Sequence, residues 1–476
     1  MLFNSGDFFF FFLVVYVLYV SIPHRAQNIL LLAASYFFYG YWDWRFLILI
    51  FISTVVDYFS GISIKSARDS LNQTLAKRWL ILSLMVNLGI LGFFKYFNFF
   101  ADSFSSFMSL FGWEVSITTL NIILPVGISF YTFQTMSYSI DVFRGHTKPT
   151  KHFADFALFV SFFPQLMAGP IERFKKLFPQ IQNKRSITYN HLTEGGWLIL
   201  WGVFKKVFIA DNMSPYTFWS VYSLESPNAG DLYVGCIAFV FQMYCDFSGY
   251  SDMARGLASL LGFKLSINFN LPYFTTNPSK FWQKWHITLG YWLRDYCYGP
   301  LAKAIKNKHN KKLALIITFA LAGLWHGADL RFIFWGIAWS IAVSTHIICQ
   351  PLLSIIKKEG GKFKNLLGIL GWIYTMHFWI FTGIIFVSAN LTNVWEAYTI
   401  LFTDFTYSDN TFKDFLTVIY FGWPLIFVQF AQYLSKDLDI IRKWPIPVKF
   451  SFYIILLFLL LVSGAEGGAE FIYFQF

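Results

Sequence analysis

Long apolar stretches recur from one end of the chain to the other, separated by short polar segments. The first covers residues 8–22 and reads FFFFFLVVYVLYVSI. The hydrocarbon core of a bilayer is about 30 Å thick, so a helix needs roughly 20 predominantly apolar residues to cross it. The pattern therefore predicts an all-α, polytopic integral membrane protein with about 11–13 transmembrane helices. Further predicted spans include residues 28–42, 46–64, 121–142, 192–210, 232–250, 313–327, 332–352, 366–389, 415–434 and 450–462.

The loops between these stretches differ in charge, and the difference predicts orientation. Lys65, Arg68, Lys77 and Arg78 share one loop, whereas residues 101–120 contain no Lys or Arg. Basic and non-basic loops alternate in this way along the chain. Because Lys and Arg are concentrated in cytoplasmic loops, we expect the basic loops in the cytoplasm and both termini outside it.

Two segments do not fit a simple crossing. Residues 153–171 are apolar, but basic residues flank both ends, and Pro164, Gly169 and Pro170 interrupt them. Irregular backbone at membrane depth is tolerated only inside a protein bundle or beside water, so we expect a re-entrant or interfacial segment here. Residues 264–312 are amphipathic and basic, which makes them too polar to cross.

Composition favours a chain that is embedded in a membrane throughout. Hydrophobic residues make up 56%, aromatic residues 22% and charged residues 13% of the 476 positions, whereas a soluble domain carries roughly 25% charged residues. The net charge of +11 would suggest nucleic acid in a soluble protein. Here the basic loops account for it, so we expect membrane lipids and no nucleic acid as partners. The four cysteines form no CxxC pair, so neither a metal site nor a disulfide framework is predicted.

One histidine lies deep within the predicted span at residues 313–327. His326 follows Lys312, which we expect at the cytoplasmic interface, by fourteen residues. That distance is roughly 21 Å of helix and places the ring past the bilayer midplane. We expect Gly323 and Gly327 to leave open space beside it. A neutral imidazole at this depth can accept or pass a proton, but position alone leaves open a structural histidine that is hydrogen-bonded between helices.

Aromatic and basic residues gather in residues 280–296, KFWQKWHITLGYWLRDY. On one continuous helix, Phe281, Trp285 and Trp292 share a face, which is typical of a helix at the membrane interface. An anchoring role accounts for the tryptophans and lysines, and the functional hypothesis is that His286 marks the cytoplasmic entrance of a path to His326. The candidate supporting residues in this segment are Trp282, Trp285, Arg294 and Asp295.

Two carboxylates flank a Ser-Gly break in residues 244–252, YCDFSGYSD. Carboxylates within a span are costly, so they face a bundle interior or a water-filled path. Asp246 and Asp252 could therefore orient a histidine or line a channel. The alternative is a structural role, in which they cap a helix or pair with Arg255.

Signatures of common soluble enzymes do not occur in the sequence. It contains no Walker loop, HExxH, GxSxG or dinucleotide-binding motif. A serine-hydrolase triad is therefore unsupported.

Several long motifs, in this order, resemble the membrane-bound O-acyltransferase (MBOAT) superfamily, most closely its bacterial alginate and peptidoglycan O-acetylation branch. They span most of the chain from about residue 120 onward. The motifs are FFPQLMAGPIERF (162–174), GVFKKVFIADN (202–212), FQMYCDFSGYSDMARGLASLLGF (241–263), NFNLPYF (268–274), FWQKWHITLGYWLRDYCYGPL (281–301), LAGLWHGADLRFIFWG (321–336) and FIYFQF (471–476).

The resemblance implies catalytic roles for His326 and for His286, the second histidine lining a central tunnel, with Trp325 as a supporting residue. It implies acetyl-CoA as the cytoplasmic acyl donor, no permanently bound cofactor, and an acceptor polysaccharide reached from the other side of a bacterial inner membrane. Relatives in this branch hand the acyl group to an extracytoplasmic esterase-like (SGNH-type) O-acetyltransferase, so we expect such a partner. Where family members often continue with a Gly-Gly-Asn-Arg-like loop, residues 298–303 read YGPLAK, so donor recognition is the least supported of these inferences.

We expect one domain over residues 1–476. Residues 1–120 would form peripheral helices, 121–352 the catalytic core region and 353–476 the C-terminal helices.

Three functional hypotheses follow. The favoured one is an acyltransferase that moves an acetyl group across the membrane for O-acetylation of a polysaccharide such as alginate or peptidoglycan, with His326 as general base or acyl carrier. The second is teichoic-acid D-alanyl transfer from a carrier-protein thioester. The third, from another class, is a transporter without covalent chemistry, which intramembrane histidines and carboxylates also suit.

Overall fold

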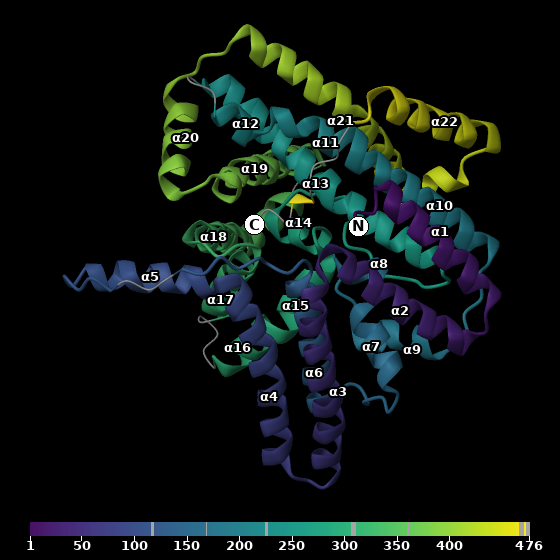
Figure 1. Ribbon diagram of the computed structural model, residues 1–476. Coiled ribbons are helices and arrows are strands. Elements are labelled where there is room, and N and C mark those ends of the chain that lie inside the picture. The colour runs from purple at the N-terminus through teal and green to yellow at the C-terminus, as the bar shows by residue number, and fades with distance from the viewer. Residues whose placement is uncertain are drawn as a thin grey trace. The chain divides into compact units, whose positions relative to one another are not determined.

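The computed structural model describes residues 1–115, 119–167, 169–223, 227–305, 311–358, 361–465 and 471–472, and helices without any strand make up its regular structure in these ranges (Figure 1). The predicted all-α class is therefore confirmed. The chain divides into two compact units, residues 1–198 with 253–266 and residues 199–252 with 267–476. Each unit is described by itself, and the single domain with three parts stays a prediction.

The first unit is built from helices of the N-terminal part of the chain. Two long helices, α10 (Tyr189–Val203) and α13 (Ala229–Leu260), begin or end in it and continue into the second unit. Its other elements are α1 (Gly6–Ser21), α2 (His24–Asp43), η1 (Trp44–Phe46), α3 (Leu47–Asp69), α4 (Gln73–Leu91), η2 (Gly92–Tyr96), α5 (Phe97–Ser109), α6 (Ile128–Arg144), α7 (Phe153–Ser161), α8 (Phe163–Leu166) and α9 (Phe174–Gln182).

The second unit contains short helices followed by longer apolar ones. Its elements are η3 (Phe204–Ala210), α11 (Asp211–Met213), η4 (Ser214–Tyr216), α12 (Phe218–Tyr222), η5 (Pro272–Phe274), α14 (Pro278–Lys284), α15 (Ile287–Leu293), η6 (Arg294–Tyr298), α16 (Gly299–Ala304), α17 (Lys311–His326), α18 (Leu330–Lys358), α19 (Gly361–Val387), α20 (Leu391–Thr403), α21 (Asp409–Ser435), η8 (Ile440–Lys443) and α22 (Ile446–Ser463).

Seven helical stretches in the described ranges are long and apolar enough to cross a membrane. One of them, His24–Asp69, joins two predicted spans, and the apolar helix Gly6–Ser21 is shorter than the rest. A multi-pass membrane protein is thereby supported, while the number of 11–13 crossings stays a prediction. The seven stretches are His24–Asp69, Gln73–Ser109, Ala229–Leu260, Leu330–Ser354, Lys364–Val387, Asp409–Ser435 and Ile446–Ser463.

The segment expected to be re-entrant does not form one continuous helix. The nine residues of α7 and the four of α8 meet at Phe162, whose backbone (φ −48°, ψ 106°) leaves the helical region. Neither helix reaches the roughly 20 residues that a crossing needs. The two prolines and the glycine noted in the sequence thus lie in the part of the segment where the helix is broken or has ended.

A buried polar network joins three helices of the first unit, α3, α4 and α6, which lie side by side (Figure 1). The carboxylate of Asp57 on α3 is fully buried and accepts hydrogen bonds from Ser83 Oγ (2.5 Å), Asn87 Nδ2 (2.7 Å) and Ser139 Oγ (2.6 Å). Helices in lipid gain little from apolar contact with one another, so hydrogen bonds and close packing must join them. Asp57 and its neighbours provide that link between the three helices.

In the second unit, α17 and α18 form an antiparallel pair whose backbones touch. A Cβ at Gly323 of α17 would overlap the carbonyl oxygen of Phe332, and one at Gly336 of α18 would overlap that of Phe319. The expectation that Gly323 and Gly327 leave open space is wrong, because the backbone and ring of Phe332 fill it. Small residues here permit helix contact, as in other membrane bundles.

Candidate active site

His286 and His326, the two histidines singled out in the sequence, line one cavity of about 720 Å³ inside the second unit. The cavity runs between α14, α15, α17 and α18, and its wall is largely apolar and aromatic. Trp282 and Arg294 line it as well. The sequence alone placed these residues in two distant motifs, and the fold brings them together.

His326 is the last residue of α17, and its ring is held among aromatic side chains. The ring centroids of Trp325, Trp335 and Phe386 lie 4.9, 5.2 and 5.3 Å away, all in edge-on arrangements. Because α17 is helical from Lys311 to His326, the expected rise of roughly 21 Å from Lys312 holds. A 5% exposed imidazole in such a setting keeps a narrow range of orientations.

The continuous helix predicted over residues 280–296 is wrong, because the chain breaks at Trp285 and His286. Trp285 is extended (φ −104°, ψ 129°), and His286 is left-handed (φ 40°, ψ 54°). A non-glycine residue with this backbone is strained and persists only where its surroundings determine it. The break ends α14 and starts α15, and His286 lies at the junction where the cavity passes.

Residues 268–270 form hydrogen bonds with the chain on both sides of this break. Asn270 N–H donates to the carbonyl of Lys284 (3.0 Å), and Ile287 N–H donates to the carbonyl of Asn268 (2.9 Å). The buried Asn268 side chain also accepts from Thr288 Oγ1 at 2.6 Å and donates to Ser251 Oγ at 3.1 Å. Sequence reasoning did not single out Asn268, although it lies in the NFNLPYF motif.

The electrostatic setting of His286 keeps its ring neutral. Burial lowers the pKa of the imidazole from 6.5 to about 3, because a charged ring would lose its hydration. A ring with so low a pKa holds no proton at physiological pH.

The candidate tryptophans are mostly interior residues, so the interpretation of an interfacial anchor does not hold for them. Trp285 is 2% exposed, and its ring lies 4.8 Å from that of Trp379. Trp325 is buried between the two histidine rings, 5.9 Å from His286 and 4.9 Å from His326. These residues hold the wall of the cavity in place.

The charged candidates fall into two groups. Arg294 lines the cavity and pairs with Asp295 through Nε–Oδ1 (2.7 Å), and Lys284 lines the cavity nearby. Asp246 and Asp252 instead pair with the buried lysines Lys206 (3.0 Å) and Lys205 (2.7 Å), and they are not among the described residues that line the cavity. Both lysines lie in the GVFKKVFIADN motif, from which the sequence predicts no role for them.

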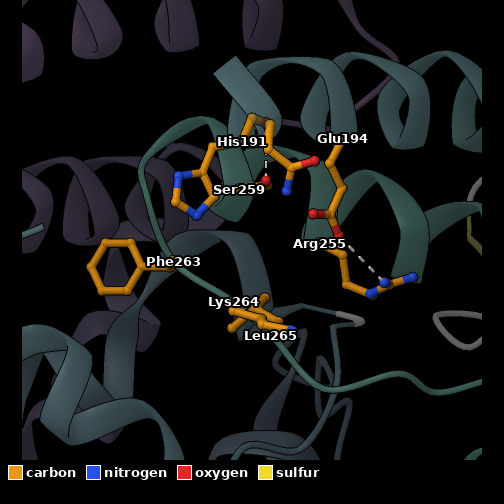
Figure 2. Close-up of a pocket in the computed structure, with 8 residues that line it drawn as sticks. His191, Glu194, Arg255, Ser259, Phe263, Lys264 and Leu265 are labelled. Carbon is orange, nitrogen blue, oxygen red and sulfur yellow. Dashed lines mark hydrogen bonds and ion pairs between the residues drawn. The ribbon is translucent and has the colours of Figure 1, made fainter. Parts of the chain in front are cut away.

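A smaller pocket of about 100 Å³ lies in the first unit, between the start of α10 and the end of α13 (Figure 2). His191, Glu194 and Arg255 point into it, and Arg255 lies 4.0 Å from Glu194 in an ion pair. The residues that line it include none of the site residues predicted from the sequence. Arg255 and Lys264 bring two positive charges to its lining and Glu194 one negative charge, and we assign the pocket no ligand.

The family profile and the individual relatives that match this chain indicate the same kind of protein. The profile of the membrane-bound O-acyltransferase family, MBOAT, matches residues 145–388, a range that includes both histidines. The chain is 41% identical to the probable alginate O-acetylase AlgI of Azotobacter vinelandii, over 86% of this chain and 80% of the relative. It is 35% identical to the peptidoglycan O-acetyltransferase of Helicobacter pylori, over 82% and 78%. A teichoic acid D-alanyltransferase of Streptococcus thermophilus is 29% identical over 44% and 54%.

Proposed function

The chain belongs to the membrane-bound O-acyltransferase family, and on that premise we propose that it moves an acetyl group across the membrane for O-acetylation of an extracytoplasmic polysaccharide. Membership makes it an acyltransferase, which sets aside the hypothesis of a transporter without covalent chemistry. The observation that carries the proposal is the shared cavity of His286 and His326, since a thioester and a hydroxyl must meet in one enclosed site. Relatives named for alginate and peptidoglycan O-acetylation support a polysaccharide acceptor.

The proposed donor is acetyl-CoA, bound from the cytoplasmic side as a substrate. Lys284 and Arg294 line the cavity where the basic segment predicted to face the cytoplasm meets it. Cationic side chains bind phosphate oxygens, so this end suits the phosphates of the donor. The apolar and aromatic remainder of the cavity suits the uncharged arm that carries the thioester.

In the proposed reaction, His326 removes the proton from an acceptor hydroxyl as its oxygen attacks the thioester carbonyl. The C–S bond then breaks, and the leaving thiolate takes the proton from the imidazolium. Alternatively, the His326 ring attacks the carbonyl first and the C–S bond breaks to release the thiolate. The acyl-imidazole then passes the acetyl group to the acceptor hydroxyl, whose proton goes to the thiolate. A positioned base contributes about 10²–10⁴-fold, and both routes require the imidazole where α17 ends.

The acetyl group must then reach its polymer outside the cytoplasm. We propose that an esterase-like, SGNH-type O-acetyltransferase on that side completes the transfer. The family resemblance of the sequence motifs supports a partner of this chemistry.

The test is the O-acetyl content of isolated envelope and exported polysaccharides from wild type, a deletion strain and His326→Ala, with His377→Ala as a matched control. The control histidine lies on α19, where its ring is hydrogen-bonded to Tyr233 Oη at 2.9 Å. We expect one polymer to lose ester-linked acetyl in the deletion and in His326→Ala only. Loss of D-alanyl esters with unchanged acetyl would replace the proposal with teichoic-acid D-alanylation, and unchanged esters of both kinds would contradict it.

A further inference from the structure

A buried cluster of charges in the second unit lies outside the catalytic cavity. Lys206 Nζ contacts Asp211 Oδ1 at 2.8 Å and Asp246 Oδ1 at 3.0 Å, and the three side chains are 1–3% exposed. Charges in a low-dielectric interior lose their hydration, so such a cluster is expensive unless its partners compensate it. Replacing it with apolar side chains is often neutral or stabilising, which suggests a task beyond stability.

The cluster holds a distant part of the chain. The second carboxylate oxygen of Asp246 accepts a hydrogen bond from the backbone N–H of Ile472 at 2.7 Å. A hydrogen bond to an ionised acceptor is roughly twice as strong as a neutral one. The neighbouring Phe471 is fully buried, and its ring lies 4.5 Å from Tyr250 and 5.8 Å from Phe247. Residues 471–472 are thus held by a hydrogen bond to a carboxylate and by ring contacts.

Residues 471–472 are linked to His286 through a chain of aromatic contacts. Phe247 lies on α13 and presents its ring edge-on to His286, with centroids 4.7 Å apart and planes at 90°. His286 in turn contacts Trp325, which contacts His326. A displacement of Phe471 therefore passes through Phe247 to the strained residue that lines the cavity.

We propose that Lys206, Asp211 and Asp246 form a clamp that seats Phe471 and Ile472, and that Phe471 thereby holds Phe247 against His286. The clamp residues and Phe471 are positioning residues, since they act on the reacting groups through Phe247 and His286. The carboxylate of Asp246 binds the backbone N–H of Ile472, so it fixes the position of the backbone whatever side chain residue 472 carries. The ring of Phe471 then packs against Phe247. The inference rests on the proposed function, because it assigns the clamp to acyl transfer.

The first test is steady-state acetyl transfer by Phe471→Ala, which leaves the charges untouched, beside Asp246→Asn, which keeps side-chain volume but weakens the anchor. Misplacement of a reacting group by about 1 Å can lower a rate about 100-fold. We expect kcat to fall about 10- to 100-fold in both variants, with KM for acetyl-CoA little changed, and Phe471→Leu to recover part of it. Phe458→Ala removes a 60% exposed ring from α22 and should match wild type.

The second test measures the rate at which diethylpyrocarbonate modifies His286, read by peptide mass spectrometry. In wild type the ring is 2% exposed and covered by Phe247. We expect faster modification in Phe471→Ala and Asp246→Asn, and wild-type protection in Phe458→Ala. Wild-type kcat together with unchanged protection in Phe471→Ala would overturn the clamp.

The two proposals fail in different ways. If His326→Ala retained normal transfer, the proposed function would fail, while the protection of His286 would still test the clamp. If His326→Ala abolished transfer and Phe471→Ala behaved as wild type in both assays, the clamp alone would fail.

Discussion

At the scale of single residues, the site depends on two imidazoles held in different ways. His326 lies among three aromatic rings at a helix end, whereas His286 occupies a left-handed junction between two short helices. The first arrangement restricts a ring by packing, and the second restricts a backbone by main-chain hydrogen bonds with Asn268, which accepts, and Asn270, which donates. Both arrangements supply the preorganisation that transfer between two substrates requires.

Removal of the Asn268 side chain should loosen the His286 junction, because that side chain holds Thr288 beside it while the main-chain hydrogen bonds remain. Asn268→Ala loses the buried hydrogen bonds to Ser251 and Thr288, each of which contributes about 0.5–1.5 kcal/mol. We expect a lower melting temperature in detergent and at least tenfold slower acetyl transfer, consistent with loss of positioning. The exposed Asn183→Ala serves as control, and equal behaviour of the two variants would contradict the role of Asn268.

The buried, neutral state of His286 makes stability depend on pH. Its pKa is lowered from 6.5 to about 3 in the folded protein, so between these values the unfolded chain binds more protons. The contribution is fully present above pH 6.5 and is lost as the pH falls toward 3, by about 1.4 kcal/mol per pH unit. Thermal denaturation from pH 7.5 to 5 should therefore show a shallower decline for His286→Gln than for wild type. The exposed His152→Gln should follow wild type, and parallel curves for all three would argue against the assignment.

At the scale of helices, close packing of α17 against α18 sets the position of His326. Gly323 and Gly336 let the two backbones touch, and any side chain there would push α17 away from α18. The α17 end that carries His326 would then move relative to Trp335 on α18.

Gly336→Ala should separate the pair. Its Cβ would overlap the carbonyl oxygen of Phe319, and overpacking of this kind costs about 1–3 kcal/mol. Gly368→Ala on α19 is the matched control, because nothing lies within 4 Å of its Cβ and alanine in a helix is favoured over glycine by about 0.5–1 kcal/mol. We expect a lower melting temperature and reduced transfer only for Gly336→Ala, and the opposite ranking would refute close packing at this position.

The helical class and the two histidines of the site could be predicted from the sequence, whereas the break between α14 and α15 could not. Apolar runs and the resemblance gave the helical class and both histidines. Periodicity could not show the break at Trp285 and His286, because long-range main-chain hydrogen bonds with Asn268 and Asn270 impose it. Nor could it show that Phe332 fills the space beside Gly323, since that contact depends on how two helices pack.

At the scale of the whole molecule, the orientation of the helices in the membrane decides from which side each substrate reaches the cavity. The basic loops predict which ends of the helices face the cytoplasm, and the proposed donor requires Lys284 on that side. Two compact units carry the helices, and the cavity with both histidines belongs to the second.

Cysteine labelling in intact cells tests the predicted orientation, on a background in which the exposed Cys349 is replaced by serine. Gln73→Cys lies at the start of α4 in a basic loop, and Leu110→Cys lies in the stretch without Lys or Arg, where the native side chain is 81% exposed. A membrane-impermeant maleimide should label Leu110→Cys from outside and Gln73→Cys only after permeabilisation. The reverse pattern would invert the topology and place the donor on the wrong side.

The most direct measurement supplies radiolabelled acetyl-CoA to inside-out membrane vesicles and follows alkali-labile label on polysaccharide. Wild type and His377→Ala should incorporate label at equal rates, and His326→Ala should incorporate at least about 100-fold less, because its loss removes the base or the acyl carrier. Label incorporated by His326→Ala at the wild-type rate would contradict the central claim that this imidazole performs the transfer.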